Sequence, residues 1–161
     1  MKDGLLTHLL VAVSGSGASI NAARYAIVMA KLYRCELTAL YVVDTATLKQ
    51  LSLSKILLSE ESEDYVQSLE ANGNRYLAFV EELAKARGVQ IEKVLRHGNV
   101  STEIMAVAQE KGADLIILGG WEKDRDPRDI VGYMHREIQV NSKVSVLVVK
   151  NRDIEQIYRR A

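Results

Sequence analysis

The sequence has little cysteine and little proline. Its only cysteine, Cys35, cannot form a disulfide within the chain, which favours a reducing compartment. Its only proline, Pro127, and its ten scattered glycines form no linker that would divide the 161 residues. We therefore expect one domain over residues 1–150, followed by a helical tail over residues 151–161.

The chain also lacks apolar runs of the length that a membrane requires. None approaches the roughly 20 residues that cross a bilayer. The run from Leu9 to Val13 is too short for the core of a signal peptide, and no small-residue cleavage site follows it. We expect a cytoplasmic protein without a membrane partner.

Neither sign of charge dominates. Lys and Arg together number 21, as do Asp and Glu, so the formal net charge is zero. This balance argues against a nucleic-acid-binding protein with a broad basic surface. An apolar fraction of 48% and a charged fraction of 26% are typical of a soluble globular domain.

Short apolar runs alternate with helical patterns along the chain. His8–Val13 is a compact apolar run that stops at Ser14-Gly15-Ser16-Gly17, which is typical of a buried parallel strand followed by a tight turn. Ser16 or Ser19 can cap a helix over residues 20–33, and a second strand follows at 36–43. Strand, helix and strand at this length predict a βαβ unit with a right-handed crossover.

The remainder of the chain repeats this alternation. Further strands are predicted at 91–95, 115–119 and 143–149, and helices at 65–87, at 101–111 with Ser101 as its cap, and from about 128. Residues 45–61 are ambiguous, because they fit a short amphipathic helix, a loosely packed crossover, or a lid or partner-binding surface. Strands that alternate with helices in this way predict a doubly wound α/β sheet.

The stretch from Ala113 to Gly132 gives the clearest indication of a site. Leu115–Gly119 is an apolar-rich strand, and the chain breaks at Gly119-Gly120 into a charged loop. In open α/β folds, ligands bind in the crevice beyond the carboxyl ends of the strands. We expect this turn to line that crevice.

This stretch resembles the last strand-loop-helix unit of the universal stress protein family. Nucleotide-binding members of that family carry Gly, two residues, Gly, nine residues, and then Gly followed by Ser or Thr. Gly119 and Gly132 match the first and last glycines at that spacing, whereas Glu122 stands at the middle glycine and Tyr133 at the hydroxyl position. Half of the motif is present.

The start of the chain is similar to the same family. Where nucleotide-binding members have an Asp that contacts the nucleoside, this chain has Ser14, and Val42 stands where a Val lies against the base. The resemblance covers Leu5 to Lys150 and implies a single α/β domain with a five-stranded parallel sheet in the order 3-2-1-4-5. The nucleotide site that it implies would comprise Ser14, Gly15, Val42, Gly119, Gly120, Glu122, Gly132 and Tyr133.

Three of these positions disfavour ordinary ATP binding. A phosphate loop needs glycines that let backbone N–H groups approach the anion, and Glu122 offers a side chain and a negative charge instead. Two unit charges 4 Å apart repel by about 4 kcal/mol at an effective dielectric near 20, against roughly 8 kcal/mol for micromolar binding. Tyr133 displaces the hydroxyl, and Ser14 cannot accept two ribose hydroxyl protons as an aspartate can.

Two alternatives involve ATP. Lys123, Arg125 and Arg128 in the charged loop would compensate Glu122 in an ATP-binding stress sensor with slow or no hydrolysis. A more remote alternative is that residues 14–19 resemble the pyrophosphate loop of ATP-dependent amidating and thiolating enzymes, although Ala18 stands where those enzymes have aspartate.

The sequence contains no catalytic or metal-binding constellation. His8, His97 and His135 lie far apart, and none has Cys or a carboxylate at metal-ligand spacing. We expect His8 at a strand start, His97 in a turn that could face the crevice, and His135 on the outer face of the last helix. The resemblance implies regulation or binding in stress tolerance rather than enzymatic turnover.

The resemblance also implies a homodimer, built by pairing the fifth strands of two subunits. Val144, Val146 and Val148 would form an apolar edge, and unprotected edges of that kind tend to pair. An alternative is that the tail over residues 151–161 folds back and covers this edge. The sequence identifies neither the stress nor a further protein partner.

Overall fold

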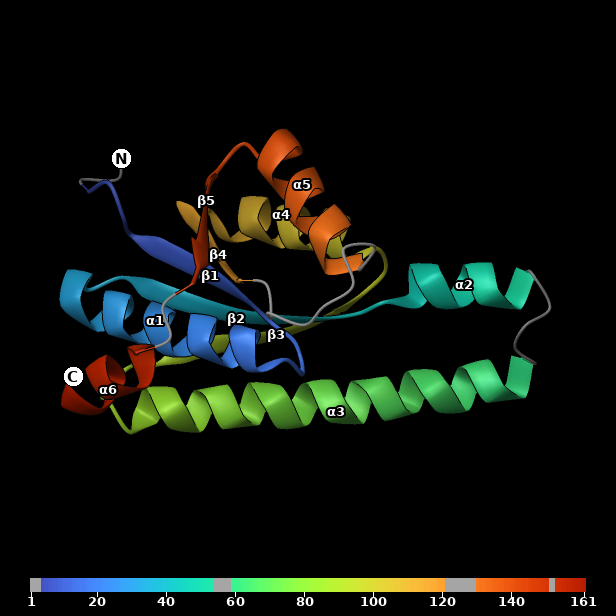
Figure 1. Cartoon of the computed structure of the whole chain (residues 1–161), viewed down its shortest axis with the longest axis horizontal. Helices are drawn as coiled ribbons and strands as arrows, with labels where there is room; N and C mark the ends of the chain where they lie inside the picture. The colour runs from blue at the N-terminus through green and yellow to red at the C-terminus, as the bar shows by residue number, and fades with distance from the viewer. Residues whose placement is uncertain (1–3, 54–58, 121–129, 151–152) are drawn as a thin grey trace.

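The computed structural model describes residues 4–53, 59–120, 130–150 and 153–161. Within them, five parallel strands form one sheet in the order β3-β2-β1-β4-β5 (Figure 1). The predicted fold class and strand order are confirmed. The elements along the chain are β1 (His8–Val13), α1 (Gly17–Tyr33), β2 (Glu36–Val43), α2 (Thr45–Leu53), α3 (Ser59–Lys85), β3 (Ile91–His97), α4 (Val100–Lys111), β4 (Leu115–Gly119), α5 (Ile130–Asn141), β5 (Ser145–Val149) and α6 (Ile154–Arg160).

Helices cover both faces of the sheet, as Figure 1 shows. Alternate residues of a strand point to opposite faces, so Leu9 and Val11 of β1 pack in the core beneath α1 and α3, whereas Leu10 packs in the core beneath α4 and α5. All three side chains are fully buried. A central strand covered on both faces needs a continuous apolar run, which explains the composition of residues 8–13.

The start of α1 is fixed by serine side chains. The backbone N–H of Ser19 donates to Oγ of Ser16 at 3.2 Å, so Ser16 is the N-cap. At its other end, α1 stops at Arg34, whose φ of 54° is left-handed and ends the helical hydrogen bonding.

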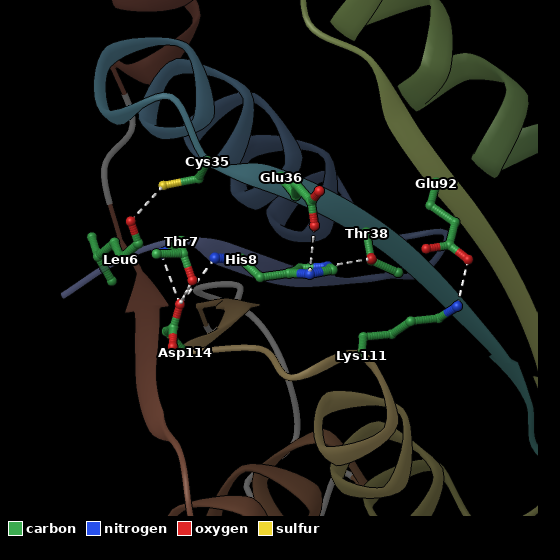
Figure 2. Close-up of polar contacts among 9 residues, drawn as sticks. All are labelled: Leu6, Thr7, His8, Cys35, Glu36, Thr38, Glu92, Lys111 and Asp114. Atoms are coloured by element: carbon green, nitrogen blue, oxygen red, sulfur yellow. Dashed lines mark hydrogen bonds and ion pairs between the residues drawn. The ribbon is translucent and has the colours of Figure 1, made fainter. Parts of the chain in front are cut away.

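A carboxylate joins the amino-terminal ends of β1 and β4, two neighbouring strands of the sheet. Oδ2 of Asp114, just before β4, accepts hydrogen bonds from the backbone N–H groups of Thr7 at 2.7 Å and His8 at 2.9 Å, and from the Thr7 hydroxyl at 2.7 Å (Figure 2). This contact holds the starts of β1 and β4 at a fixed register.

The ambiguous residues 45–53 form helix α2, which lies beside the first turns of α3 beyond the sheet (Figure 1). Residues 54–58 of the ambiguous stretch lie outside the described part of the chain. Helix α3 extends past the sheet, and Tyr65 near its start is 51% exposed.

The structure corrects the predicted cap of α4. Asn99, not Ser101, caps α4, because its side-chain oxygen accepts from the backbone N–H of Thr102 at 3.1 Å. Ser101 is buried within the helix and donates to Glu137 at 2.8 Å. On α3, Phe79 is 43% exposed, whereas the neighbouring Val80 is fully buried in the core.

In the tail, Ile154–Arg160 form helix α6, which packs against α1. The Tyr158 hydroxyl donates to the carbonyl of Leu83 at 2.7 Å, and the guanidinium of Arg87 lies 4.7 Å from the centre of the Tyr158 ring. In the part of the chain that the structure describes, no helix is both long and apolar enough to cross a membrane.

Candidate functional site

The carboxyl ends of β1 and β4 diverge at the point where the strand order reverses, and this is where a crevice forms. Gly119 ends β4 so close to the first turn of α1 that no side chain fits between them. The next residue, Gly120, donates its backbone N–H to the carbonyl of Val149 at 2.9 Å. A Cβ atom on Gly120 would stand 2.7 Å from that same oxygen, so the Gly119-Gly120 pair is required by close packing.

The turn between β1 and α1 is held by its own serines. The Ser19 hydroxyl donates to the carbonyl of Ser14 at 2.7 Å and accepts from the Ser14 backbone N–H at 2.9 Å. The Ser14 hydroxyl lies 3.1 Å from that of Ser16 and is exposed. This turn therefore presents the Ser14 hydroxyl at the mouth of the crevice.

A cavity of about 190 Å³ opens at this edge and extends into the layer between the sheet and α4 and α5. Its wall on the sheet side consists of Ala12, Leu40, Val42 and Leu118, from three neighbouring strands. Helices α4 and α5 contribute the remaining wall, which includes Val100, Ile104, Met134 and His135. The mouth lies at the turns and includes Ser14, Ser16, Gly119 and Gly120.

The structure brings together four of the residues that the sequence assigned to a site. Ser14, Val42, Gly119 and Gly120 all line the cavity. Gly15 instead lies against α3, where a Cβ atom would stand 3.0 Å from the Tyr76 hydroxyl.

The remaining predicted residues lie in other parts of the sequence. Gly132 and Tyr133 belong to the first turn of α5, whereas Glu122 lies outside the described residues. Of the predicted dimer edge, Val146 and Val148 lie in β5, and Val144 directly precedes that strand.

His135 is a cavity residue that the sequence analysis placed wrongly. It was expected on the outer face of the last helix, yet it is only 3% exposed and lines the cavity. The sequence did contain a signal, because His135 precedes Ile138 by three residues, and positions three apart share one face of a helix. Ile138 is fully buried.

The other two histidines lie away from the cavity. His97, at the end of β3, has its Nε2 atom 2.6 Å from Oε1 of Glu70 on α3 and is not among the residues that line the cavity. His8 is the first residue of β1, as expected, so it lies at the end of the strand that is farther from the cavity. Among the described residues, no group of three or more His, Cys, Asp or Glu side chains could hold a metal ion.

The described lining of the cavity carries no Lys, Arg, Asp or Glu side chain. Its ionisable groups are His135 and Tyr41. Burial is the main cause that raises the pKa of Tyr41, and the nearby Tyr76 and Tyr65 add to it, so Tyr41 is neutral at physiological pH. The described walls can therefore contact apolar or hydrogen-bonding groups, but they offer no charge to balance a phosphate.

This fold and this crevice define a doubly wound α/β domain with a ligand-sized cavity at its switch point. The sequence pattern of the Universal stress protein family matches residues 6–150. The chain is also 31% identical over 149 residues to Universal stress protein MJ0531 of Methanocaldococcus jannaschii, a span of 92% of this chain and 84% of that protein. The chain belongs to the universal stress protein family.

Solved structures show the same fold. Universal stress protein UspA from Lactobacillus plantarum matches with a TM-score of 0.76 and 21% identity, over 92% of this chain and 100% of that one. The universal stress protein from Archaeoglobus fulgidus in complex with dAMP matches with a TM-score of 0.63 and 17% identity, over 91% and 100% of the two chains.

Proposed function

We propose that this chain is a regulatory binding module that acts as a homodimer in the cytoplasm, does not bind ATP in the usual manner of its family, and does not turn over a substrate. The observation that carries the proposal is the chemistry of the crevice. Its described lining is apolar and uncharged, so the groups that would neutralise a triphosphate are missing from that part of the wall.

The position of Ser14 supports the same conclusion. Its side chain lies at the mouth of the cavity, where a nucleoside sugar would be contacted, and it has one hydroxyl group rather than a carboxylate. That hydroxyl already lies 3.1 Å from the hydroxyl of Ser16. A ribose with two vicinal hydroxyl groups would gain at most a weak contact here.

The alternative is an ATP-binding stress sensor, and one finding favours it. The structurally similar protein from Archaeoglobus fulgidus is in complex with dAMP. In this chain, Lys123, Arg125 and Arg128 would have to supply the positive charge for a phosphate, against Glu122 in the same loop. All four lie outside the described residues.

The homodimer is proposed on the exposed edge of the sheet. β5 is the last strand in the sheet and pairs with β4 on one side only. Helix α6 packs against α1, which speaks against the alternative that the tail covers the β5 edge. Val146 and Val148 are half-buried in the single chain, and pairing with a second β5 would bury them further.

Two measurements test the proposal. Mass spectrometry of small molecules released from the purified, denatured protein, together with ATP titration calorimetry, should find no co-purified ATP and no micromolar binding. Sedimentation velocity should find a dimer at micromolar concentration. Co-purified ATP or micromolar affinity would establish the sensor alternative, and a monomer would refute the dimer.

A further inference from the structure

We propose that a groove at the amino-terminal ends of the strands binds an acidic segment of a partner protein. The segment places one apolar side chain in the groove and its carboxylates on the arginines around it. This groove lies at the opposite end of the strands from the cavity, so the inference goes beyond the proposed function and concerns a second surface of the same module.

The groove measures about 460 Å³ and is open to solvent. It lies between the end of α1, the start of β2 and the turn that joins α3 to β3. Ala30 and Val89 line it and are themselves buried, so they form an apolar floor. Burial against this floor would stabilise an apolar side chain of a ligand. A concave site of this kind accepts a chain segment, whereas the flat surface of a membrane would span it.

Positive charge gathers around the groove. Lys31 and Arg34 line it, and both are exposed. Helix α6 adds Arg160 nearby, because Nζ of Lys31 donates to the carbonyl oxygen of the next residue, Ala161, at 2.7 Å. In the described part of the chain, neither Arg34 nor Arg160 forms an ion pair with a carboxylate. These two charges are therefore available to an acidic ligand.

Two further contacts favour a positive potential at the groove. Arg87 directly precedes the groove residue Gly88, and its guanidinium lies 4.7 Å from the centre of the buried Tyr158 ring. This cation–π contact positions the guanidinium but does not neutralise its charge. Glu36 is the acidic residue of the lining, and its carboxylate is directed at His8, with 3.3 Å between Oε2 and Nδ1 (Figure 2).

Arg34 has a backbone conformation that normally belongs to glycine. Its φ is 54°, and among the described residues it is the only one other than glycine with a positive φ. It ends α1, where glycine would adopt the left-handed conformation without a steric cost. Backbone strain of this kind concentrates at functional sites. We therefore attribute the arginine at this position to binding rather than to the fold.

The composition of this surface fits a protein partner. Leu32 and Tyr33 are 68% and 60% exposed, on the same last turn of α1 as Lys31 and beside Arg34. Tyrosine and arginine are enriched in protein–protein interfaces. A few arginines around one groove match a short acidic segment, whereas a nucleic acid needs a broad basic surface and an anionic membrane needs a larger basic cluster.

The test uses a capped peptide of six glutamates around one central leucine, titrated into the full chain and followed by amide chemical shifts. We expect saturable binding that shifts the signals of Arg34, Gly88 and Gln90. Raising the salt concentration from about 50 mM to about 500 mM should weaken binding at least fivefold. A peptide with glycine in place of the leucine should bind about threefold more weakly, and one with lysines in place of the glutamates should not bind.

Variants of Arg34 separate binding from stability. Arg34→Gly removes the charge and the strain together, so it should weaken the peptide about threefold while the midpoint of urea unfolding stays the same or rises. Arg34→Glu reverses the charge and should weaken the peptide about tenfold. Arg136→Glu makes the same change at an exposed position of α5, on the other face of the sheet, and should leave the affinity within about twofold.

Each other occupant of the groove has its own outcome. No saturable binding of the peptide with leucine, or binding that Arg34→Gly and Arg34→Glu leave intact, overturns the inference. Tighter binding of anionic phospholipid vesicles or of single-stranded DNA than of the peptide overturns the choice of partner. Self-association in sedimentation velocity that Arg34→Glu abolishes would assign the groove to a second copy and also overturn that choice. Micromolar ATP binding refutes the proposed function and leaves the peptide result unaffected.

Discussion

Gly119 at the end of β4 lies in backbone contact with Ala18 in the first turn of α1. A Cβ atom on Gly119 would stand 2.7 Å from both the carbonyl carbon and the carbonyl oxygen of Ala18, and 2.8 Å from the backbone nitrogen of Ser19. These neighbours are backbone atoms, which cannot rotate away as a side chain can. The contact fixes the distance between α1 and β4, and with it the width of the crevice.

Gly119→Ala should therefore destabilise the fold. We expect a loss of about 1–3 kcal/mol in the free energy of unfolding, the usual cost of overpacking, measured by urea denaturation. Gly4→Ala is the matched control, because its nearest neighbours would stand 3.7 Å from the new Cβ atom, and its effect should stay within about 0.5 kcal/mol. Equal stability of the two variants would show that α1 and β4 can separate without cost.

Glycine usually destabilises a helix relative to alanine, but Gly73 in α3 stabilises the fold, because a larger residue would not fit at this position. A Cβ atom here would stand 2.5 Å from the ring of Tyr41 and 2.9 Å from the side chain of Leu95. Tyr41 cannot easily yield, because it is buried and its ring stacks with that of Tyr76 at a centroid distance of 6.3 Å. Gly73 thus allows α3 to lie close to β2 and β3.

Gly73→Ala should consequently lower stability by about 1–3 kcal/mol, although alanine in place of glycine ordinarily stabilises a helix by about 1 kcal/mol. The adjacent Asn74 is exposed, so Asn74→Ala should show only the gain from helix propensity, up to about 0.7 kcal/mol. Thermal or urea unfolding measures both. A stabilised Gly73→Ala would mean that the helix shifts freely along the sheet.

The sequence predicted the elements of this fold well, because each depends on a local pattern. Apolar runs such as His8–Val13 mark strands buried on both faces, and the order of the sheet followed from the family resemblance. The role of Gly73 was not predictable from a local pattern. Its partner Tyr41 lies 32 positions earlier, and helix periodicity alone makes a glycine look like a weak point.

The candidate site was predictable only in part, for the same reason. Ser14 follows β1, whereas Val42 and Gly119 lie at the carboxyl ends of β2 and β4, and the topology brings the ends of these strands together. His135 was expected on the outer face of the last helix but is buried, on the same face as Ile138 three positions later. The apolar walls of Leu40, Ile104 and Leu118 look like ordinary core residues in the sequence, and only the packing shows that they enclose a space.

A buried hydrogen bond joins β1 and β2 near the amino-terminal ends of both strands. Nε2 of His8 lies 2.7 Å from the Thr38 hydroxyl, and its Nδ1 lies 3.3 Å from a carboxylate oxygen of Glu36 (Figure 2). Thr38 is fully buried and His8 is 9% exposed. Thr38→Val removes the partner of Nε2 and should lower the free energy of unfolding by about 1–3 kcal/mol, the cost of an unsatisfied buried polar group.

The double variant His8→Phe, Thr38→Val tests this explanation. Once both partners are apolar, no polar atom of the pair remains unsatisfied, so the double variant should be more stable than the sum of the two single losses predicts. A coupling energy of about 0.5–3 kcal/mol in urea unfolding is expected. Additive losses would show that the hydrogen bond contributes little.

Cys35 should react slowly as long as the protein is folded. Burial, and to a lesser degree the charge of Asp114, raises the pKa of its thiol, which lies 3.3 Å from the Leu6 carbonyl (Figure 2). The thiolate is the reactive form, so at pH 8 an aromatic disulfide reagent should modify native Cys35 several-fold more slowly than the urea-unfolded chain. Because the folded pKa is raised, any contribution of this group to stability is present below pH of about 8.5 and is lost as pH rises beyond it. Equal rates in the native and unfolded chains would contradict the raised pKa, and Cys35→Ser gives the background rate.

The β5 edge offers the sharpest test of the proposed homodimer. Lysine on an edge strand discourages pairing with a second strand, because it places a charge where two sheets would meet. Val148 is half-buried in β5 and belongs to neither of the two core clusters, so Val148→Lys should leave the single chain folded and shift the dimer to monomer in sedimentation velocity at micromolar concentration. Val140→Lys adds the same charge to α5, where the valine is 80% exposed, and should leave the association unchanged. A dimer that persists in Val148→Lys and dissociates in Val140→Lys would move the interface from the β5 edge to the outer face of α5.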